Sequence, residues 1–289
     1  MVLGAASWLG YLLINRLVSS GYPVSGSLYQ QQPEFGTDNL ELFFATTPKD
    51  YVRALEQRKP DFVVNFLRGE DEQGLEIHKT IINYCHLNGA VYLYASSVLA
   101  LDAYENIPLT EDLKAHSLSP YGIFKAKCEE LLQVSRINYT ILRFASVQGW
   151  VPHKITRNEA FLQKLAKGQV VTVDRGVVQN RMPASVLIRG IVDIIKKRIT
   201  GILHFGSTDA SEEFHFLQKQ AVRFGYPIDF VQGGSFRRVN LVAVPNRIFQ
   251  ELGQEYRQSE EATLEYLCNI PGLIKYKVTD QQQSLPNEI

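Results

Sequence analysis

The stretch MVLGAASWLG, residues 1–10, decides the fold, because it runs from a short apolar segment into a glycine turn and then into a helix. Residues 1–3 form the end of a strand, and apolar side chains at positions 9, 12, 13 and 17 follow the spacing of a helix. Gly4 allows the tight turn after the strand, and Gly10 lets the helix pack closely on it. The segment therefore predicts a strand–turn–helix unit at the start of an α/β fold.

Short apolar runs and helical stripes continue to alternate up to about residue 150. Strands are predicted at 23–28, 40–45, 62–67, 91–95 and 139–144, and helices at 48–58, 75–88 and 121–134. Thr47 and Pro48 are a typical N-cap and first residue for one of these helices. The alternation implies right-handed strand–helix–strand units, and hence a Rossmann-type doubly wound parallel sheet.

The pattern changes after Gly149. Helices are predicted at 159–167, 184–197, 212–224, 245–252 and 260–267, with one short strand at 201–205. We expect residues 1–149 to form the Rossmann domain, to which residues 184–206 return. Residues 150–183 and 207–289 are then expected to form a smaller, mixed C-terminal lobe.

Composition excludes several classes of protein. The chain is 45% hydrophobic and 21% charged, which is ordinary for a soluble globular protein. Its 30 basic and 30 acidic residues cancel, so we expect neither nucleic acid nor a membrane surface as a partner. No apolar run approaches the ~18–20 residues that span a bilayer. The first ten residues lack the basic leader of a signal peptide, so none is expected.

The cysteines and histidines point to a cytoplasmic protein without a metal site. Cys85, Cys128 and Cys268 form no CxxC pattern, and the six histidines form neither HxxxH nor HExxH. Reduced structural thiols are therefore expected, and no metal ligands.

The glycine turn has two interpretations. Gly4 and Gly10 fit the outer glycines of a GxxGxxG loop, with Ser7 in the middle position. In such a loop the amino terminus of the following helix, which here begins with Trp8 and Leu9, faces a pyrophosphate. Ser7 is small and can donate a hydrogen bond, which keeps this interpretation open beside that of a plain strand–helix turn.

Three polar side chains occur in the order that a hydride-transfer site needs. Ser97 ends the run VYLYASS, and Tyr121 and Lys125 lie four residues apart in SPYGIFKAKCEELL. Tyrosine has an unperturbed pKa of about 10, which a lysine one helical turn away can lower. Tyr121 could then exchange a proton with a substrate oxygen to which Ser97 hydrogen-bonds. The alternative is that Tyr121 is an aromatic residue at a helix start and Lys125 a solvated side chain.

In combination, these motifs resemble the extended short-chain dehydrogenase/reductase superfamily. The resemblance rests on the glycine turn at 4–10, the strand at 91–97, the helix start at 120–125, and the segments 140–143 and 147–149. Within the superfamily the chain is similar to dTDP-4-dehydrorhamnose reductases and related NAD-dependent epimerase-like sugar-nucleotide enzymes. That finer similarity rests on the segments 60–65, 110–112, 174–175 and 181–183.

The resemblance implies an enzyme that binds NAD(P)H in the Rossmann domain and a nucleotide-linked sugar in the smaller lobe. Ser97, Tyr121 and Lys125 would be the catalytic residues, and Arg181 would bind the substrate diphosphate. The implied cofactor contacts are Gly4, Ser7, Trp8, Leu9, Gly10, Phe66, Leu67 and Lys125. Reductase and epimerase activities both stay open, as does a homo-oligomer. A dehydratase is disfavoured, because Val98-Leu99-Ala100 offers no acidic residue beside Ser97.

The adenosine end of the implied cofactor site departs from its relatives. The second strand ends in Leu28-Tyr29-Gln30-Gln31, without the acidic residue that holds the ribose 2′-hydroxyl of NAD, so NADP is expected to be preferred. Phe44 stands where relatives often have an aspartate near the adenine. Arg68 either reaches a phosphate or is a solvated loop arginine. These departures keep open a second class of function, a non-catalytic or regulatory Rossmann-fold nucleotide-binding protein.

Overall fold

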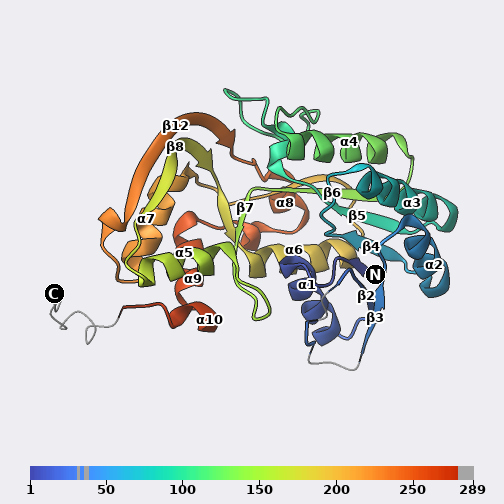
Figure 1. Cartoon of the computed structure of the whole chain (residues 1–289). Helices are drawn as coiled ribbons and strands as arrows, with labels where there is room; N and C mark the ends of the chain where they lie inside the picture. The colour runs from blue at the N-terminus through green and yellow to red at the C-terminus, as the bar shows by residue number, and fades with distance from the viewer. Residues whose placement is uncertain (31–32, 36–38, 279–289) are drawn as a thin grey trace.

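The computed structural model describes residues 1–30, 33–35 and 39–278, and its larger lobe is built on a seven-stranded parallel sheet (Figure 1). The strand order is β10-β6-β5-β4-β1-β2-β3. The strands are β1 (Val2–Leu3), β2 (Val24–Leu28), β3 (Leu40–Phe44), β4 (Phe62–Asn65), β5 (Val91–Ala95), β6 (Tyr139–Phe144) and β10 (Gly201–Phe205). The predicted α/β fold with a Rossmann-type doubly wound parallel sheet is thereby confirmed.

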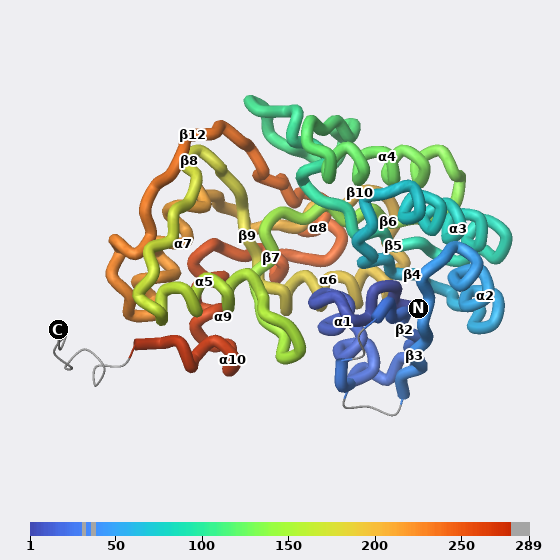
Figure 2. The backbone as a smooth tube through the Cα atoms, in the orientation of Figure 1, coloured from blue at the N-terminus to red at the C-terminus, as the bar shows by residue number. Residues whose placement is uncertain are grey.

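Helices cover both faces of this sheet (Figure 2). On one face α1 (Trp8–Ser19) and α6 (Ala184–Lys197) enclose an apolar core. On the other face a second core lies beneath α2 (Pro48–Arg58), α3 (Glu72–Asn88) and α4 (Pro120–Val134). Every side chain of the inner strand β5 is buried, which explains why its sequence reads as a continuous apolar run.

The helix starts follow local capping chemistry. Thr47 accepts a hydrogen bond from the Asp50 N–H, and the Asp50 carboxylate accepts one from the Thr47 N–H, so the predicted cap of α2 is confirmed. Helix α4 begins in a similar way, with the Ser119 side chain accepting from the Gly122 N–H and Pro120 in the first turn. This start fixes Tyr121 in the first turn of α4, directly beside the carboxyl ends of the strands.

A second lobe contains a small three-stranded sheet of order β11-β8-β12. Its elements are α5 (Arg157–Ala166), β8 (Val171–Gln179), β11 (Ser211–Glu212), α7 (Glu213–Arg223), β12 (Val231–Leu241), α9 (Glu260–Cys268) and α10 (Pro271–Ile274). The sequence predicts most of these helices but not β8 and β12. Strand β12 carries two register shifts along β8, so its apolar residues do not alternate regularly.

Several segments connect the two lobes. Strand β7 (Ser146–Gln148) pairs with β9 (Arg181–Pro183), and β10 lies beside β6 at the edge of the large sheet. Helix α8 (Asn246–Glu251) packs into the same core as α6, although the sequence places this segment with the smaller lobe. Short 3₁₀ turns cover Val98–Leu101, Ile228–Phe230 and Gln254–Tyr256.

None of the helices within residues 1–30, 33–35 and 39–278 has both the length and the apolar character to cross a membrane.

Candidate functional site

The glycine turn is held so tightly that two of its positions exclude any side chain. Gly4 has φ +81°, and its N–H donates to the Ser27 hydroxyl at 2.9 Å. A Cβ on Gly4 would lie 3.2 Å from the main chain of Phe66. A Cβ on Gly10 would lie 2.2 Å from the Gly4 carbonyl oxygen, well inside van der Waals contact. The turn therefore brings strand β1, helix α1 and the end of β4 into direct backbone contact.

The amino terminus of α1 offers backbone donors at this turn. The Ser7 hydroxyl caps the helix by accepting the Gly10 N–H at 3.0 Å. The N–H groups of Trp8 and Leu9 belong to the first turn, where a helix supplies no internal acceptors and carries partial positive charge. This arrangement suits a phosphate group.

Phe66 and Leu67 follow β4 beside the turn. The Phe66 N–H donates to the Leu3 carbonyl at 3.0 Å, and its side chain is buried in the core. The Leu67 N–H donates to the Asn65 side chain at 2.8 Å. Among the predicted cofactor contacts, Phe66 therefore presents main chain rather than side chain to the Gly4 turn.

Ser97, Tyr121 and Lys125 meet at the carboxyl end of β5. The Lys125 ammonium is buried and donates to the Ala95 carbonyl at 2.9 Å. Its Nζ lies 5.5 Å from the centroid of the Tyr121 ring. The Ser97 hydroxyl accepts the Leu99 N–H at 3.2 Å, which leaves its own proton available for another acceptor.

Gly122 explains how Tyr121 comes so close to Ser97, a role the sequence analysis missed. A Cβ on Gly122 would lie 2.2 Å from the Leu99 carbonyl oxygen and 2.0 Å from the Ser117 hydroxyl. The first turn of α4 therefore rests directly on the backbone that follows Ser97. The glycine immediately after Tyr121 is the sequence signal that could have revealed this contact.

Burial shifts the pKa values of both Lys125 and Tyr121. Burial lowers the pKa of Lys125 to about 8. Burial also raises the pKa of Tyr121, while the Arg68 charge and hydrogen bonding with Ser97 act in the opposite direction. Arg68, which the sequence analysis left as a phosphate ligand or a solvated arginine, thus lowers the pKa of Tyr121 against the effect of burial.

Arg181 lies elsewhere than expected. Its guanidinium is 0% exposed and donates to Glu213 and Glu260, each at 2.8 Å. Burial alone would raise the pKa of Glu213, but Arg157 and Arg181 hold it below its usual value. With both carboxylates engaged, the Arg181 guanidinium ties α7 and α9 to β9 and is not presented to a substrate diphosphate.

At the predicted adenosine end, Tyr29 and Phe44 are 64% and 63% exposed. Tyr29 lines a cavity of about 220 Å³ that runs past Thr46 and Arg68 toward α3 and α4. Gln30 is exposed, and Gln31 falls outside the described residues. The described residues at this end therefore offer apolar and amide side chains but no carboxylate where β2 ends.

His153 makes an unexpected contact with the glycine turn. Its Nε2 lies 3.1 Å from the Ala6 carbonyl oxygen, and its ring centroid lies 4.6 Å from that of Tyr11 on α1. The residue comes from the loop between β7 and α5, and no local sequence pattern predicts that this loop approaches the turn. The loop closes one side of the turn.

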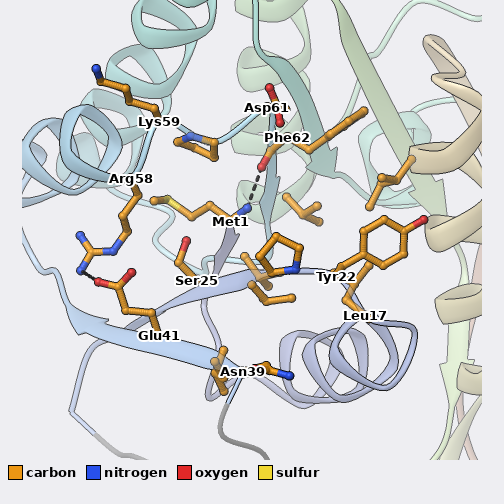
Figure 3. A pocket seen from close by; sticks show the side chains of 18 of the residues that line it. Met1, Leu17, Tyr22, Ser25, Asn39, Glu41, Arg58, Lys59, Asp61 and Phe62 are labelled. Carbon is orange, nitrogen blue, oxygen red and sulfur yellow. Dashed lines mark hydrogen bonds and ion pairs between the residues drawn. The ribbon is translucent and has the colours of Figure 1, made fainter.

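A larger cavity, of about 1230 Å³, lies at the opposite end of the strands, where they begin (Figure 3). It lies between the amino-terminal ends of β2 and β4. The strand between them, β1, has only two residues. The Met1 ammonium points into this region and donates to the Phe62 carbonyl at 2.8 Å, and its burial lowers its pKa to about 5. Ligands of open α/β sheets bind at the carboxyl ends of the strands, so this cavity is not the candidate site.

Across the described parts of the chain, no three histidine, cysteine, aspartate or glutamate side chains gather as a metal site would require.

Comparison with known proteins agrees with this geometry. The model of the NAD dependent epimerase/dehydratase family matches residues 1–180. The sequence matches no curated protein.

Solved structures share the fold over nearly the whole chain. The enzyme WbmH of Bordetella bronchiseptica, in complex with NAD+, is 17% identical with a TM-score of 0.79, over 96% of this chain and 98% of that chain. A dTDP-4-dehydrorhamnose reductase from Clostridium acetobutylicum is 18% identical with a TM-score of 0.71, over 92% and 96%. A UDP-glucose 4-epimerase from Thermotoga maritima with UDP-glucose is 17% identical with a TM-score of 0.72, over 92% and 97%. At these identities the similarity describes the fold.

Proposed function

The chain belongs to the NAD dependent epimerase/dehydratase family, and we propose that it is an NAD(P)-dependent reductase or epimerase acting on a nucleotide-linked sugar, similar to dTDP-4-dehydrorhamnose reductases. One observation carries the proposal. The buried Lys125 ammonium is anchored on the Ala95 carbonyl, 5.5 Å from the ring of Tyr121, at the strand end that also carries Ser97. A buried cation, a phenol and a hydroxyl around one strand end are the groups that carbonyl reduction or alcohol oxidation requires.

The glycine turn fits a dinucleotide. Gly4 turns the chain at a positive φ, Gly10 lets α1 pack against the turn, and the first N–H groups of α1 can bind a phosphate. Ser7, Trp8 and Leu9 would hold the pyrophosphate, and Lys125 the nicotinamide ribose. When bound, the nicotinamide supplies or accepts the hydride. Because Leu28, Tyr29 and Gln30 at the end of β2 include no carboxylate, NADPH should bind more tightly than NADH, and comparing the two Kd values tests this.

The chain's own residues supply the proton chemistry. Tyr121 gives a proton to the sugar oxygen during reduction, and takes it back in the reverse direction. Ser97, whose Oγ accepts the Leu99 N–H, would donate its own proton to the same oxygen. These two groups position the carbonyl and neutralise the charge that develops on it.

The substrate class rests on relatives and on the second lobe. Structures with the same fold carry UDP-glucose, and one is a dTDP-4-dehydrorhamnose reductase. We assign residues 1–149 and 184–206 to cofactor binding, and 150–183 with 207–289 to the sugar nucleotide. The three buried, unpaired cysteines suit a cytoplasmic enzyme, which could form homo-oligomers.

Turnover tests the proposal. Purified protein is supplied with NADPH or NADH and with dTDP-4-dehydrorhamnose, and oxidation of the cofactor is followed by absorbance. UDP- and dTDP-hexoses are tested in parallel, with epimer formation followed by nuclear magnetic resonance. The proposal expects one of these reactions in the wild type and its loss in Tyr121→Phe.

A non-catalytic nucleotide-binding protein is the second candidate. It is favoured by the exposed Tyr29 and Phe44 at the adenosine end, and by the engagement of Arg181 with two carboxylates. Cofactor binding without any turnover across the substrate panel would select this function.

A further inference from the structure

Arg68 lies at the mouth of the candidate site with few interactions of its own. It follows β4, and its side chain is 81% exposed. Its nearest charged partner is Glu70, with Nε 3.7 Å from the carboxylate, which is longer than a hydrogen bond. Its guanidinium carbon lies 5.9 Å from the centroid of the Tyr121 ring. The arginine is therefore close to the tyrosine without being neutralised by a tight ion pair.

We propose that Arg68 is a positioning residue that stabilises the negatively charged form of Tyr121 during proton transfer. The inference rests on the proposed function, in which Tyr121 loses and regains a proton. A cation over an aromatic face is attracted by the ring electrons, and the attraction grows when the ring oxygen becomes charged. Arg68 acts through Tyr121 and is not assigned a contact with the reacting atoms.

The groups around Tyr121 show why a second cation matters. Lys125 is buried and its Nζ also lies 4.7 Å from the Tyr94 ring centroid, while its proton is directed to Ala95. Burial lowers the pKa of Lys125 to about 8, so its charge is lost at alkaline pH. An arginine keeps its charge over the whole working range. Arg68 therefore stays positively charged at alkaline pH, where Lys125 becomes neutral.

Glu70 and Ser97 complete the surroundings. After burial, Arg68 is the largest influence on the pKa of Tyr121 and lowers it, Glu70 raises it, and hydrogen bonding with Ser97 lowers it. Arg68 and Glu70 come from the same loop and oppose each other. The loop after β4 therefore influences the pKa of Tyr121 through two exposed side chains of opposite charge.

The expected effect is modest because Arg68 is exposed to water. Water screens the charge of an exposed side chain, so its influence on a neighbouring group is small. Removing the Arg68 charge should raise the pKa of Tyr121, and removing the Glu70 charge should lower it by less. A purely structural role for Arg68 would move neither value.

The test titrates Tyr121 directly and needs no substrate. The chain has 14 tyrosines, so each charge variant is made with and without Tyr121→Phe, and the difference in tyrosinate absorbance between the two isolates Tyr121. The charge variants are Arg68→Gln, Arg68→Lys and Glu70→Gln. Arg53→Gln is the matched control, because Arg53 is an exposed arginine on another element, α2.

We expect Arg68→Gln to raise the pKa of Tyr121. Arg68→Lys should stay near wild type, Glu70→Gln should fall below it, and Arg53→Gln should match it. An unchanged value in Arg68→Gln, or the same shift in Arg53→Gln, overturns the inference. Turnover is measured separately. If turnover is absent but Arg68→Gln shifts the pKa of Tyr121 as expected, only the proposed function is refuted. If turnover is present but the pKa does not shift, only the role of Arg68 is refuted.

Discussion

Tyr121 and Lys125 lie on one helical turn but occupy different surroundings. Lys125 is enclosed and hydrogen-bonded to the end of β5, whereas Tyr121 is half-buried at the mouth of the site. The phenol can therefore reach a substrate while the ammonium stays fixed behind it. This division of roles makes different predictions for the two side chains.

Replacing Tyr121 by phenylalanine should remove turnover but leave the fold and cofactor binding nearly intact. The change deletes one hydroxyl and keeps the ring, so the packing of the ring survives. General acid–base work is worth ~10²–10⁴-fold, which corresponds to about 3–5 kcal/mol of transition-state stabilisation. Steady-state kinetics and cofactor titration on the same preparation check this, and near-normal activity would remove the tyrosine from the mechanism.

Lys125→Met should weaken cofactor binding as well as turnover. The substitution keeps the length of the side chain but removes the charge that would contact the nicotinamide ribose. Because burial lowers the pKa of Lys125 to about 8, the lysine is charged below that pH and neutral above it. Wild-type cofactor affinity should therefore fall as pH rises through about 8, and this dependence should vanish in the variant. Lys127→Met is the control, because Lys127 is an exposed lysine on the same helix. If both variants bind the cofactor like wild type at every pH, Lys125 has no part in cofactor binding.

At the scale of single residues, the sequence located the three catalytic candidates because short motifs carry them. It did not locate their electrostatic partners. The placement of Arg181 depends on Glu213 and Glu260, which lie 32 and 79 residues further along the chain. Such pairings are formed by tertiary packing and leave no local pattern.

Among the elements, the junction between α4 and the 3₁₀ turn Val98–Leu101 controls the distance between Tyr121 and Ser97. Gly122 permits it, because any Cβ there would overlap the Leu99 carbonyl oxygen. The contact couples helix packing to the geometry of the site.

Gly122→Ala should therefore separate Ser97 from Tyr121. Overpacking of this kind costs about 1–3 kcal/mol of stability, and turnover should fall more than cofactor affinity. Chemical denaturation and kinetics check the two effects. Gly69→Ala is the matched control, since its Cβ would meet nothing closer than 3.6 Å. Equal behaviour of the two alanine variants would show that the close contact is not needed.

At this scale, regular elements were predictable and irregular ones were not. The inner strands β4 and β5 are largely buried on both faces, so their sequences are short apolar runs. Strands β8 and β12 are partly exposed, contain glycines and pair with shifts in register. Their side chains follow neither an apolar run nor a regular alternation.

For the whole molecule, two buried histidines link stability to pH. Burial lowers the pKa of His78 to about 4, and burial together with Arg143 lowers that of His204 to about 3. His78 is held neutral between the Tyr92 hydroxyl and the Cys128 carbonyl. Both histidines therefore bind protons more weakly in the folded chain than in the unfolded chain.

The free energy of unfolding should accordingly be highest above pH ~6.5 and should decrease as pH falls toward 4. At pH 5 each histidine accounts for a loss of about 2 kcal/mol. Denaturant unfolding at pH 7.5 and pH 5 measures the difference. It should shrink in His78→Gln and persist in His86→Gln, an exposed histidine on the same helix. The same pH dependence in both variants would exclude His78 as a cause.

The arrangement of the two lobes was only partly predictable. The return of β10 to the large sheet follows from its apolar sequence, but α8 packs into the large core from a segment expected in the smaller lobe. His153 crosses from the β7–α5 loop to the glycine turn. Contacts of this range depend on how the lobes pack, which short sequence patterns do not encode.

Titration of NADPH and NADH into the wild type, Gly10→Ala and Lys125→Met, followed by fluorescence, tests the central claim most directly. The claim is that the glycine turn and Lys125 hold one nicotinamide dinucleotide across the carboxyl ends of the strands. It predicts saturable binding of at least one dinucleotide to the wild type. Binding should be weakened in Gly10→Ala, whose Cβ would overlap the Gly4 carbonyl, and in Lys125→Met. Absence of saturable binding to the wild type, or unchanged affinity in both variants, would contradict it.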